Sequence, residues 1–261
     1  RDLHLSLRRQ RQMCIRDRFG SMTSTGTGDS TTSTGTAAAR MVGGSKIYGT
    51  GDTEVRALDG VDVEFERGCF TAIMGPSGSG KSTLMHCSAG LDDLTSGTVH
   101  IGDVELGDLS ERDLTLLRRD KVGFVFQAFN LIPTLTAEEN LTLPLDLAGR
   151  KPDASWMVNI IETVGLPDRL RHRPDELSGG QQQRVAIARS LAKRPRLLLG
   201  DELTGNLDSN TSSVVMEVLV KACESEGITC VFVTHDETLV EFATRVVRID
   251  SGKITTDEIV G

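Results

Sequence analysis

Residues 75–83 read GPSGSGKST and match the pattern G-x-x-x-x-G-K-[ST] of loops that hold nucleotide phosphates. The glycines let the backbone turn tightly and bring amide N–H groups close to an anion. Lys81 supplies a positive charge for the β- and γ-phosphates, and Ser82 offers a hydroxyl to Mg²⁺. The loop joins an apolar run at 70–74, an expected buried strand, to an expected helix at 81–89, whose N-terminus favours phosphate. We therefore predict that the whole loop binds a nucleotide, through Gly75, Pro76, Ser77, Gly78, Ser79, Gly80, Lys81, Ser82 and Thr83.

Length, charge and cysteine content limit the class of protein. The chain has 261 residues, enough for one α/β domain or two small ones with a sizeable core. Its net charge is −8, and an acidic body argues against nucleic acid as the main partner. No apolar run is long enough to span a membrane. The five cysteines are scattered without a C-x-x-C pair, which favours buried thiols in a reducing compartment over disulfides or a zinc site.

The first forty residues differ in composition from the rest of the chain. Residues 1–21 are rich in arginine and lack the apolar core and cleavage site of a signal peptide. We interpret them as foreign to the native protein, with Met22 as its start; an Arg-rich transit peptide is the alternative. Serine, threonine and glycine dominate the following segment, which cannot bury enough apolar surface to become ordered. We therefore expect a disordered leader at 1–40.

From residue 41 onward the pattern is that of an α/β domain. Strand patterns recur at 61–65, 70–74, 99–101, 122–126, 197–200, 230–234 and 246–249. Helix signals cover most of 136–194 and also 210–226. Strands that alternate with helices around a phosphate loop predict a mostly parallel sheet with helices on both faces. We expect one domain at 41–261, with its core at 41–126 and 196–261 and an inserted helical subdomain at 127–195.

Residues 197–202 read LLLGDE, an apolar strand that ends in two acids. A buried parallel strand that stops at a carboxylate places this group at the carboxyl edge of the sheet, beside the phosphate loop. Asp201 is then expected to bind Mg²⁺, directly or through water, and Glu202 to orient and polarise an attacking water. The alternative is a solvated acidic turn, which the phosphate loop in the same chain disfavours.

Residues 177–184 read LSGGQQQR and suggest a second phosphate-binding surface. Ser178 is a good helix N-cap, and apolar residues follow at helical spacing. The two glycines at the helix entrance expose N–H donors at the positive end of its dipole. One bound nucleotide does not need two such surfaces. On the residue types alone, an ordinary capped helix is the favoured interpretation.

LSGGQQQR resembles the signature sequence of the ATP-binding cassette (ABC) ATPases, and with the phosphate loop the resemblance covers roughly residues 41–260. It implies a mostly parallel P-loop NTPase core of the RecA-like type, an antiparallel β subdomain and an inserted helical subdomain. It also implies that ATP and Mg²⁺ lie between two copies of the chain, the phosphate loop of one facing the signature of the other around a two-fold axis. The signature residues that would contact the nucleotide of the partner are Ser178, Gly179, Gly180 and Gln181.

Other positions match the pattern of the family one by one. Tyr48 stands where the family has an aromatic that stacks on adenine; a surface strand tyrosine is the alternative. Gln127 matches the glutamine that touches the metal and the attacking water, and is otherwise a polar residue at a strand end. Asp208 matches a residue that faces the partner cassette, and His235 the switch histidine that contacts the γ-phosphate. The resemblance thus assigns catalysis to Glu202, His235, Lys81 and Gln127, and the metal to Ser82, Gln127 and Asp201.

One position departs from the family. Leu203 follows the acidic pair where the family usually has proline, and the loss of the fixed φ predicts a less rigid loop and slower turnover. Five residues match no functional position and are assigned to packing or to the surface: Cys69, His86, His100, His172 and Trp156.

The segments at 126–136 and 205–208 resemble a bacterial subgroup with macrolide-export, lipoprotein-releasing and antimicrobial-peptide-export ATPases. The resemblance implies an ATP-hydrolysing subunit that drives a membrane permease, peripheral at the cytoplasmic face of the cell membrane. The helical subdomain, near 127–139, is the expected docking surface for the permease. A regulatory ATPase that couples mechanically to a non-transporting membrane partner, as in cell division, stays open. A soluble ABC ATPase of DNA repair or translation would need a coiled-coil insertion or a second cassette, and neither is present.

Overall fold

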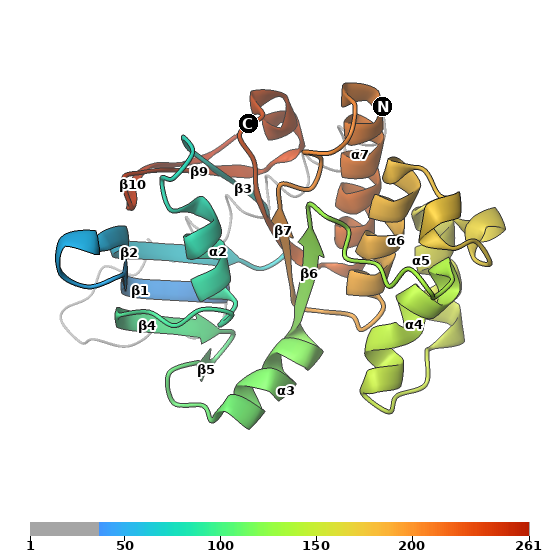
Figure 1. The fold of residues 1–261 in the computed structure, drawn as a ribbon, viewed down its shortest axis with the longest axis horizontal. Helices are drawn as coiled ribbons and strands as arrows, with labels where there is room; N and C mark the ends of the chain where they lie inside the picture. Colours follow the sequence, from blue (N-terminus) through green and yellow to red (C-terminus); the bar gives the residue numbers. More distant parts are fainter. Residues whose placement is uncertain (1–36, 261) are drawn as a thin grey trace, which may run out of the picture.

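A six-stranded sheet forms the centre of the molecule in a computed structural model that describes residues 37–260 (Figure 1). Its strand order is β10-β9-β3-β8-β7-β6, and every neighbouring pair is parallel except β10 with β9. The strands are β3 (Phe70–Met74), β6 (Val122–Phe126), β7 (Leu197–Asp201), β8 (Thr229–Val233), β9 (Arg245–Asp250) and β10 (Lys253–Ile259). The expected mostly parallel core is confirmed.

A second, antiparallel sheet packs beside the first one (Figure 1). Its order is β2-β1-β4-β5, with β1 (Ala37–Tyr48), β2 (Val55–Glu66), β4 (Ser96–Ile101) and β5 (Val104–Glu105). This sheet is the antiparallel β subdomain that the resemblance implied.

Helices cover both faces of the six-stranded sheet. Helix α2 (Lys81–Ser88) lies between the two sheets, and α3 (Glu111–Lys121) precedes β6. The segment 127–195, expected as the inserted subdomain, carries α4 (Ala137–Leu147), α5 (Ala154–Thr163) and α6 (Gly179–Leu191) and no strand within the described chain. Helix α7 (Ser209–Glu226) packs against α6 and leads into β8.

Alternate residues of the central strands face two separate apolar cores. On β8, Val231 and Val233 join the core between the two sheets, which also contains Leu84 of α2. Cys230 and Phe232 point to the other core, shared with α6 and α7. Because both faces are covered, the strands read as continuous apolar runs, and this explains why sequence patterns located most of them.

The expected leader is four residues too long. Residues 37–40 form the beginning of β1, where Ala39 is fully buried and pairs with Phe65 of β2 and Ile101 of β4. Alanine has a low strand propensity, so the run of three alanines gave no strand signal after the Ser/Thr/Gly-rich segment. The rest of the expected leader, 1–36, lies outside the described residues.

The ammonium group of Lys193, just beyond α6, is largely buried, and burying this charge lowers the free energy of unfolding. Its ammonium donates a hydrogen bond to the Arg118 carbonyl at 3.3 Å. Burial lowers the pKa of Lys193 to about 8. The unfolded chain, with an ordinary lysine pKa, therefore holds more protons than the folded protein between about pH 8 and pH 10, and unfolding free energy rises with pH in this window.

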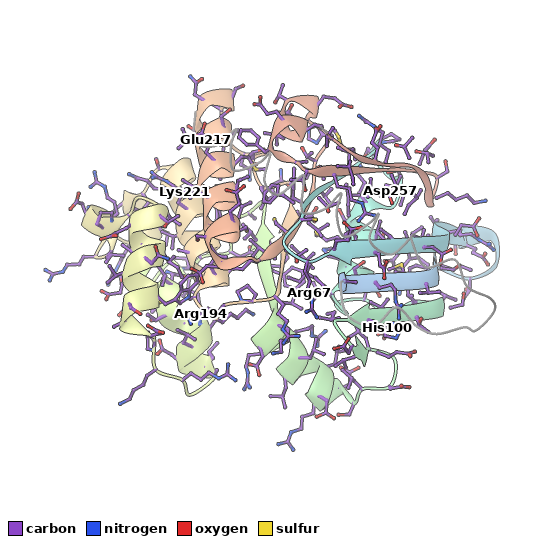
Figure 2. All side chains as sticks on the ribbon, turned by 180° about the vertical axis from the view of Figure 1, so that it is seen from behind. Arg67, His100, Arg194, Glu217, Lys221 and Asp257 are labelled. Carbon is purple, nitrogen blue, oxygen red and sulfur yellow. The ribbon has the colours of Figure 1, made fainter. Side chains whose placement is uncertain are left out.

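We expect Lys193→Met to raise the unfolding free energy by about 2 kcal/mol at pH 7, because it removes a buried charge and keeps an apolar stem. The advantage should shrink as the pH approaches 10. Urea unfolding at both pH values measures it. Lys221→Met, at an exposed lysine of α7 (Figure 2), is the matched control and should change little at either pH. An advantage of K193M that is independent of pH would contradict the explanation by charge.

Candidate functional site

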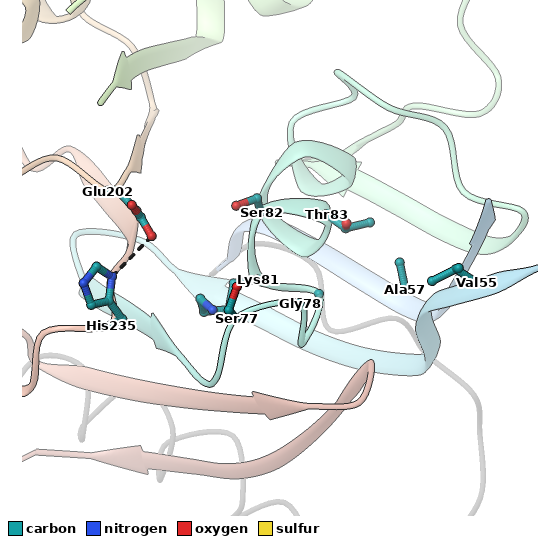
Figure 3. A pocket seen from close by; sticks show the side chains of 10 residues that line it. Val55, Ala57, Ser77, Gly78, Lys81, Ser82, Thr83, Glu202 and His235 are labelled. Atoms are coloured by element: carbon teal, nitrogen blue, oxygen red, sulfur yellow. Dashed lines mark hydrogen bonds and ion pairs between the residues drawn. The ribbon is translucent and has the colours of Figure 1, made fainter. Parts of the chain in front are cut away.

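A cavity of about 510 Å³ opens between the phosphate loop and the carboxyl edge of the sheet (Figure 3). This volume lies in the usual range for small-molecule sites. Its lining comes from β2, the phosphate loop with the start of α2, and the segments after β7 and β8. The lining residues are Val55, Ala57, Ser77, Gly78, Gly80, Lys81, Ser82, Thr83, Glu202 and His235.

The phosphate loop has a conformation that its glycines make possible. Gly80 precedes α2 with φ +103°, and a Cβ there would lie 2.3 Å from the Ala57 carbonyl oxygen. No other residue type fits this combination of angle and space. The Lys81 ammonium is held within the loop, where it donates to the carbonyl oxygens of Gly75 at 2.9 Å and Pro76 at 2.6 Å. A fixed positive charge therefore stands at the N-terminus of α2, as the sequence predicted for an anion site.

The side chains of Ser82 and Asp201 come from separate elements and contact each other directly. The Ser82 hydroxyl donates to Asp201 Oδ1 at 3.1 Å, which joins the first turn of α2 to the end of β7. A hydroxyl and a carboxylate are hard oxygen donors of the kind Mg²⁺ prefers. Among residues 37–260 no group of three or more His, Cys, Asp or Glu side chains forms a metal site. The donor types of the pair Ser82 and Asp201 fit a Mg²⁺ ion.

Glu202 and His235 form the polar wall opposite the phosphate loop. Glu202 Oε1 lies 3.3 Å from His235 Nδ1, an interaction drawn in Figure 3. Glu202 has φ +45°, and its N–H donates to the Val233 carbonyl at 3.2 Å. A left-handed conformation costs a non-glycine residue about 1 kcal/mol, and such residues cluster at functional sites. The turn directs the Glu202 carboxylate into the cavity immediately after Asp201.

Leu203, the residue at the position where the family usually has proline, is packed into the core. This side chain is 3% exposed and belongs to the core shared with α6 and α7. Its carbonyl accepts a hydrogen bond of 2.6 Å from Gln183 Nε2 of α6. Burial and this hydrogen bond anchor the loop in place of the fixed φ that proline would supply.

Other expected site residues lie outside the cavity. Ser178 caps α6, accepting from Gln181 N at 3.4 Å, while Gln181 Oε1 accepts from Ser178 N at 2.9 Å. Asp208 caps α7 through Thr211 N at 3.1 Å. Gln127 directly follows β6 and lies beside Gly205, where an added Cβ would be 2.6 Å from the Gln127 Nε2. The remaining signature residues, Gly179 and Gly180, pack against Leu207 and Thr211, and neither lines the cavity.

Tyr48 stands at the rim of the site. It ends β1 and pairs with Val55 of β2, which lines the cavity. The two residues enclose a short turn, so the side chain lies near the cavity without being part of its wall.

The sequence did not single out Val55, Ala57 or His86. Val55 and Ala57 lie on β2, after the turn that follows Tyr48. A prediction that this segment pairs with β1 as a hairpin would have placed them beside Tyr48. His86, assigned to packing or surface, lies one helical turn after Ser82 and places Nε2 3.9 Å from Asp201 Oδ2. Trp156 is packed in the core as expected, and its Nε1 donates to the carbonyls of Leu191 and Ala192 at 3.2 Å each.

Residues 58–205, more than half of the chain, match the family model described as ABC transporter. The chain belongs to the ABC transporter family. It is an ATP-binding and ATP-hydrolysing subunit of this family, as the motifs predicted.

Two relatives with similar sequences are named for two kinds of system, lipoprotein release and macrolide export. It is 45% identical over 215 residues to the lipoprotein-releasing system ATP-binding protein LolD of Geobacter metallireducens, covering 82% of this chain and 96% of LolD. It is 46% identical over 213 residues to the macrolide export ATP-binding/permease protein MacB of Bdellovibrio bacteriovorus. That match covers 82% of this chain but only 33% of MacB.

A solved structure of the ABC cassette MJ0796, a protein of Methanocaldococcus jannaschii, is similar to most of this chain. It is a dimer in a post-hydrolysis state bound to ADP and Pi. The TM-score is 0.76 at 41% identity, and the match covers 85% of this chain and 99% of that one. Between residues 37 and 260 no helix combines the length and apolar character needed to cross a bilayer.

Proposed function

We propose that two copies of this chain bind two ATP molecules between them and that hydrolysis drives a membrane permease. One observation carries the proposal: of the two surfaces that the sequence predicts to bind phosphate, the phosphate loop lines the cavity and the N-terminus of α6 does not. We therefore infer that the N-terminus of α6, with Ser178 to Gln181, contacts the nucleotide bound in the cavity of the other copy. The dimeric state of MJ0796 with ADP and Pi supports this arrangement.

The residues of one cavity divide the work of hydrolysis. The phosphate-loop amides and Lys81 hold the β- and γ-phosphates and stabilise the charge that develops on the phosphoryl group. Glu202 orients and polarises the attacking water, and His235 supports the Glu202 carboxylate and contacts the γ-phosphate. Ser82 and Asp201, with Gln127, would hold Mg²⁺, which supplies Lewis-acid charge neutralisation when bound. Tyr48 stacks on the adenine ring.

The partner copy completes each site. Ser178, Gly179, Gly180 and Gln181 present the positive end of α6 to the γ-phosphate, and Asp208 faces the partner near the same seam. Loss of the γ-phosphate removes the group that both copies hold, so the dimer opens. This opening shifts the permease because the two states of the cassette pair favour different permease conformations.

We propose that the permease docks on the segment 127–139, at the cytoplasmic face of the membrane. In this segment Phe129 and Asn130 both have positive φ, and their carbonyls accept hydrogen bonds from Arg189 of α6. Ile132 is 40% exposed nearby. This anchoring connects the docking surface to the helix that carries the signature. The similarity to MacB and LolD supports export or extraction of a hydrophobic substrate or a lipoprotein.

Complementation between inactive variants tests the shared site. Lys81→Ala and Ser178→Glu should each abolish hydrolysis, the second because its carboxylate repels the phosphates of the partner site. In a mixed dimer, one of the two sites receives an unaltered phosphate loop from one copy and an unaltered signature from the other. An equimolar mixture should therefore recover about a quarter of the wild-type phosphate release, since half of the dimers are mixed and each has one intact site.

The matched control mixes Lys81→Ala with Glu202→Gln. Lys81 and Glu202 both line the cavity of their own copy, so every site in the mixed dimer stays defective and no activity should return. Equal recovery in both mixtures, or recovery in neither, would contradict the shared site.

A further inference from the structure

We propose that Asp92 and Lys46 position the Tyr48 ring as the platform for the nucleobase, so that base binding depends on two residues outside the ATP cavity. The inference rests on the proposed stacking of adenine on Tyr48. Asp92 and Lys46 are positioning residues, since neither lines the cavity.

One carboxylate holds both side chains. The Tyr48 hydroxyl donates to Asp92 Oδ2 at 2.5 Å, and the Lys46 ammonium donates to Asp92 Oδ1 at 2.6 Å. Burial raises the pKa of Asp92, but the hydrogen bonds from Lys46 and Tyr48 outweigh it and keep the pKa below its ordinary value. Charge-assisted hydrogen bonds of this kind are short and directional. They restrict the rotation of Tyr48 about its side-chain bonds.

Lys46 also covers one face of the ring. Its Nζ lies 4.9 Å from the Tyr48 ring centroid, within the range of a cation–π contact. The Lys46 side chain is itself only 13% exposed, whereas Tyr48 as a whole is 41% exposed. The ring is thus supported from one side by a partly buried cation and leaves surface available to a planar base.

The segment that holds Tyr48 is continuous with the phosphate helix. Asp92 lies four residues beyond the end of α2, the helix that starts at Lys81. Thr95, in the same segment, accepts from Ile47 N at 2.9 Å and donates its N–H to the Ser45 carbonyl at 2.8 Å. Lys46 Nζ makes a further hydrogen bond of 2.6 Å to the Asp93 carbonyl. The last residues of β1 are therefore fastened to the far end of α2.

This connection matters because a nucleotide has a limited length between its base and its phosphates. The phosphate loop is at one end of α2, and the Tyr48 platform is attached beyond the other end. Helix α2 thus acts as a rigid spacer that sets the separation of the two binding groups, and preorganisation of this kind raises affinity.

The test compares a ligand with a base and a ligand without one. We measure ADP and inorganic pyrophosphate binding to the full chain by isothermal titration calorimetry, because neither ligand is consumed. Tyr48→Ala should weaken ADP binding about tenfold, and Asp92→Asn about fivefold, while pyrophosphate affinity stays unchanged in both. In the Tyr48→Ala background, Asp92→Asn should have no further effect on ADP binding.

The matched control is Asp93→Asn, which removes the same charge one residue away, where the backbone carbonyl rather than the side chain accepts from Lys46. It should bind both ligands as the wild type does. Lys46→Met should resemble Asp92→Asn, since it removes the ammonium and keeps much of the apolar stem.

Each alternative result has a distinct meaning. Unchanged ADP affinity in Tyr48→Ala would overturn the stacking role and this inference with it. Loss in Tyr48→Ala with none in Asp92→Asn would overturn the inference alone. Equal weakening of ADP and pyrophosphate in Asp92→Asn would overturn it too, as the sign of a purely structural residue.

Tyr48 is the only tyrosine of the chain, so fluorotyrosine labelling yields a single ¹⁹F resonance. ADP should shift this resonance in the wild type. Asp92→Asn should broaden it before ADP is added, because the ring then samples several orientations. A sharp, unshifted resonance in Asp92→Asn would contradict the positioning role.

Discussion

Replacing Glu202 with glutamine should slow ATP hydrolysis by at least about 100-fold while ATP binding persists. The amide keeps the size of the side chain and its place beside His235 but cannot polarise water as a carboxylate does. The ATP-bound dimer should therefore accumulate, because the γ-phosphate that joins the two copies is no longer removed. Phosphate release in the presence of the permease and size-exclusion chromatography with ATP measure the two effects.

Glu237→Gln is a suitable control for this experiment. Glu237 follows His235 by two residues, is exposed, and pairs with Arg248 at 2.9 Å rather than lining the cavity. Its replacement should leave both hydrolysis and the dimer equilibrium close to wild type. Hydrolysis at the wild-type rate in E202Q would remove Glu202 from its proposed role.

Lys81→Ala should weaken ATP binding about 100-fold, because it removes the only lysine or arginine among the described residues that line the cavity. The ammonium is held by the loop carbonyls of Gly75 and Pro76, so it needs little rearrangement to meet a phosphate. Binding of a fluorescent ATP analogue measures the change.

Lys253→Ala serves as the control, since Lys253 is exposed and pairs with Asp59 at 3.1 Å. It removes the same charge and should not alter affinity. A small effect of K81A, similar to that of K253A, would show that the backbone amides of the loop are sufficient for binding.

Much of the architecture could be predicted because the central strands are buried on both faces. The run at 70–74 and the run at 122–126 coincide with β3 and β6. The phosphate loop and the acidic pair Asp201 and Glu202 were placed correctly, because the first lies between a strand and a helix and the second ends a parallel strand. These elements could be predicted from local sequence and from the rule that binding residues lie at the carboxyl ends of parallel strands.

The antiparallel sheet was harder to predict. Strand β1 contains Gly43 and Gly44, and its pairing with β2 shifts register at several points, so no clean alternation marks it. In the six-stranded sheet, the edge strand β10 gave no signal either, because it is largely exposed and polar. The approach of His86 to Asp201 and of Asp92 to Tyr48 depends on how α2 lies between the sheets, and no spacing in the sequence reports that packing.

Strands β7 and β8 are adjacent and parallel, with Asp201 opposite Val233. Glu202 and His235 therefore leave the sheet from neighbouring strands, and hydrogen bonds that belong to the scaffold determine their separation. In the proposed cycle, Glu202 and His235 keep their relative positions when the two copies separate after hydrolysis. Each copy should return to its next ATP with the carboxylate and imidazole already in place, so that the mechanical cycle consists of the approach and retreat of α6 on the opposite copy.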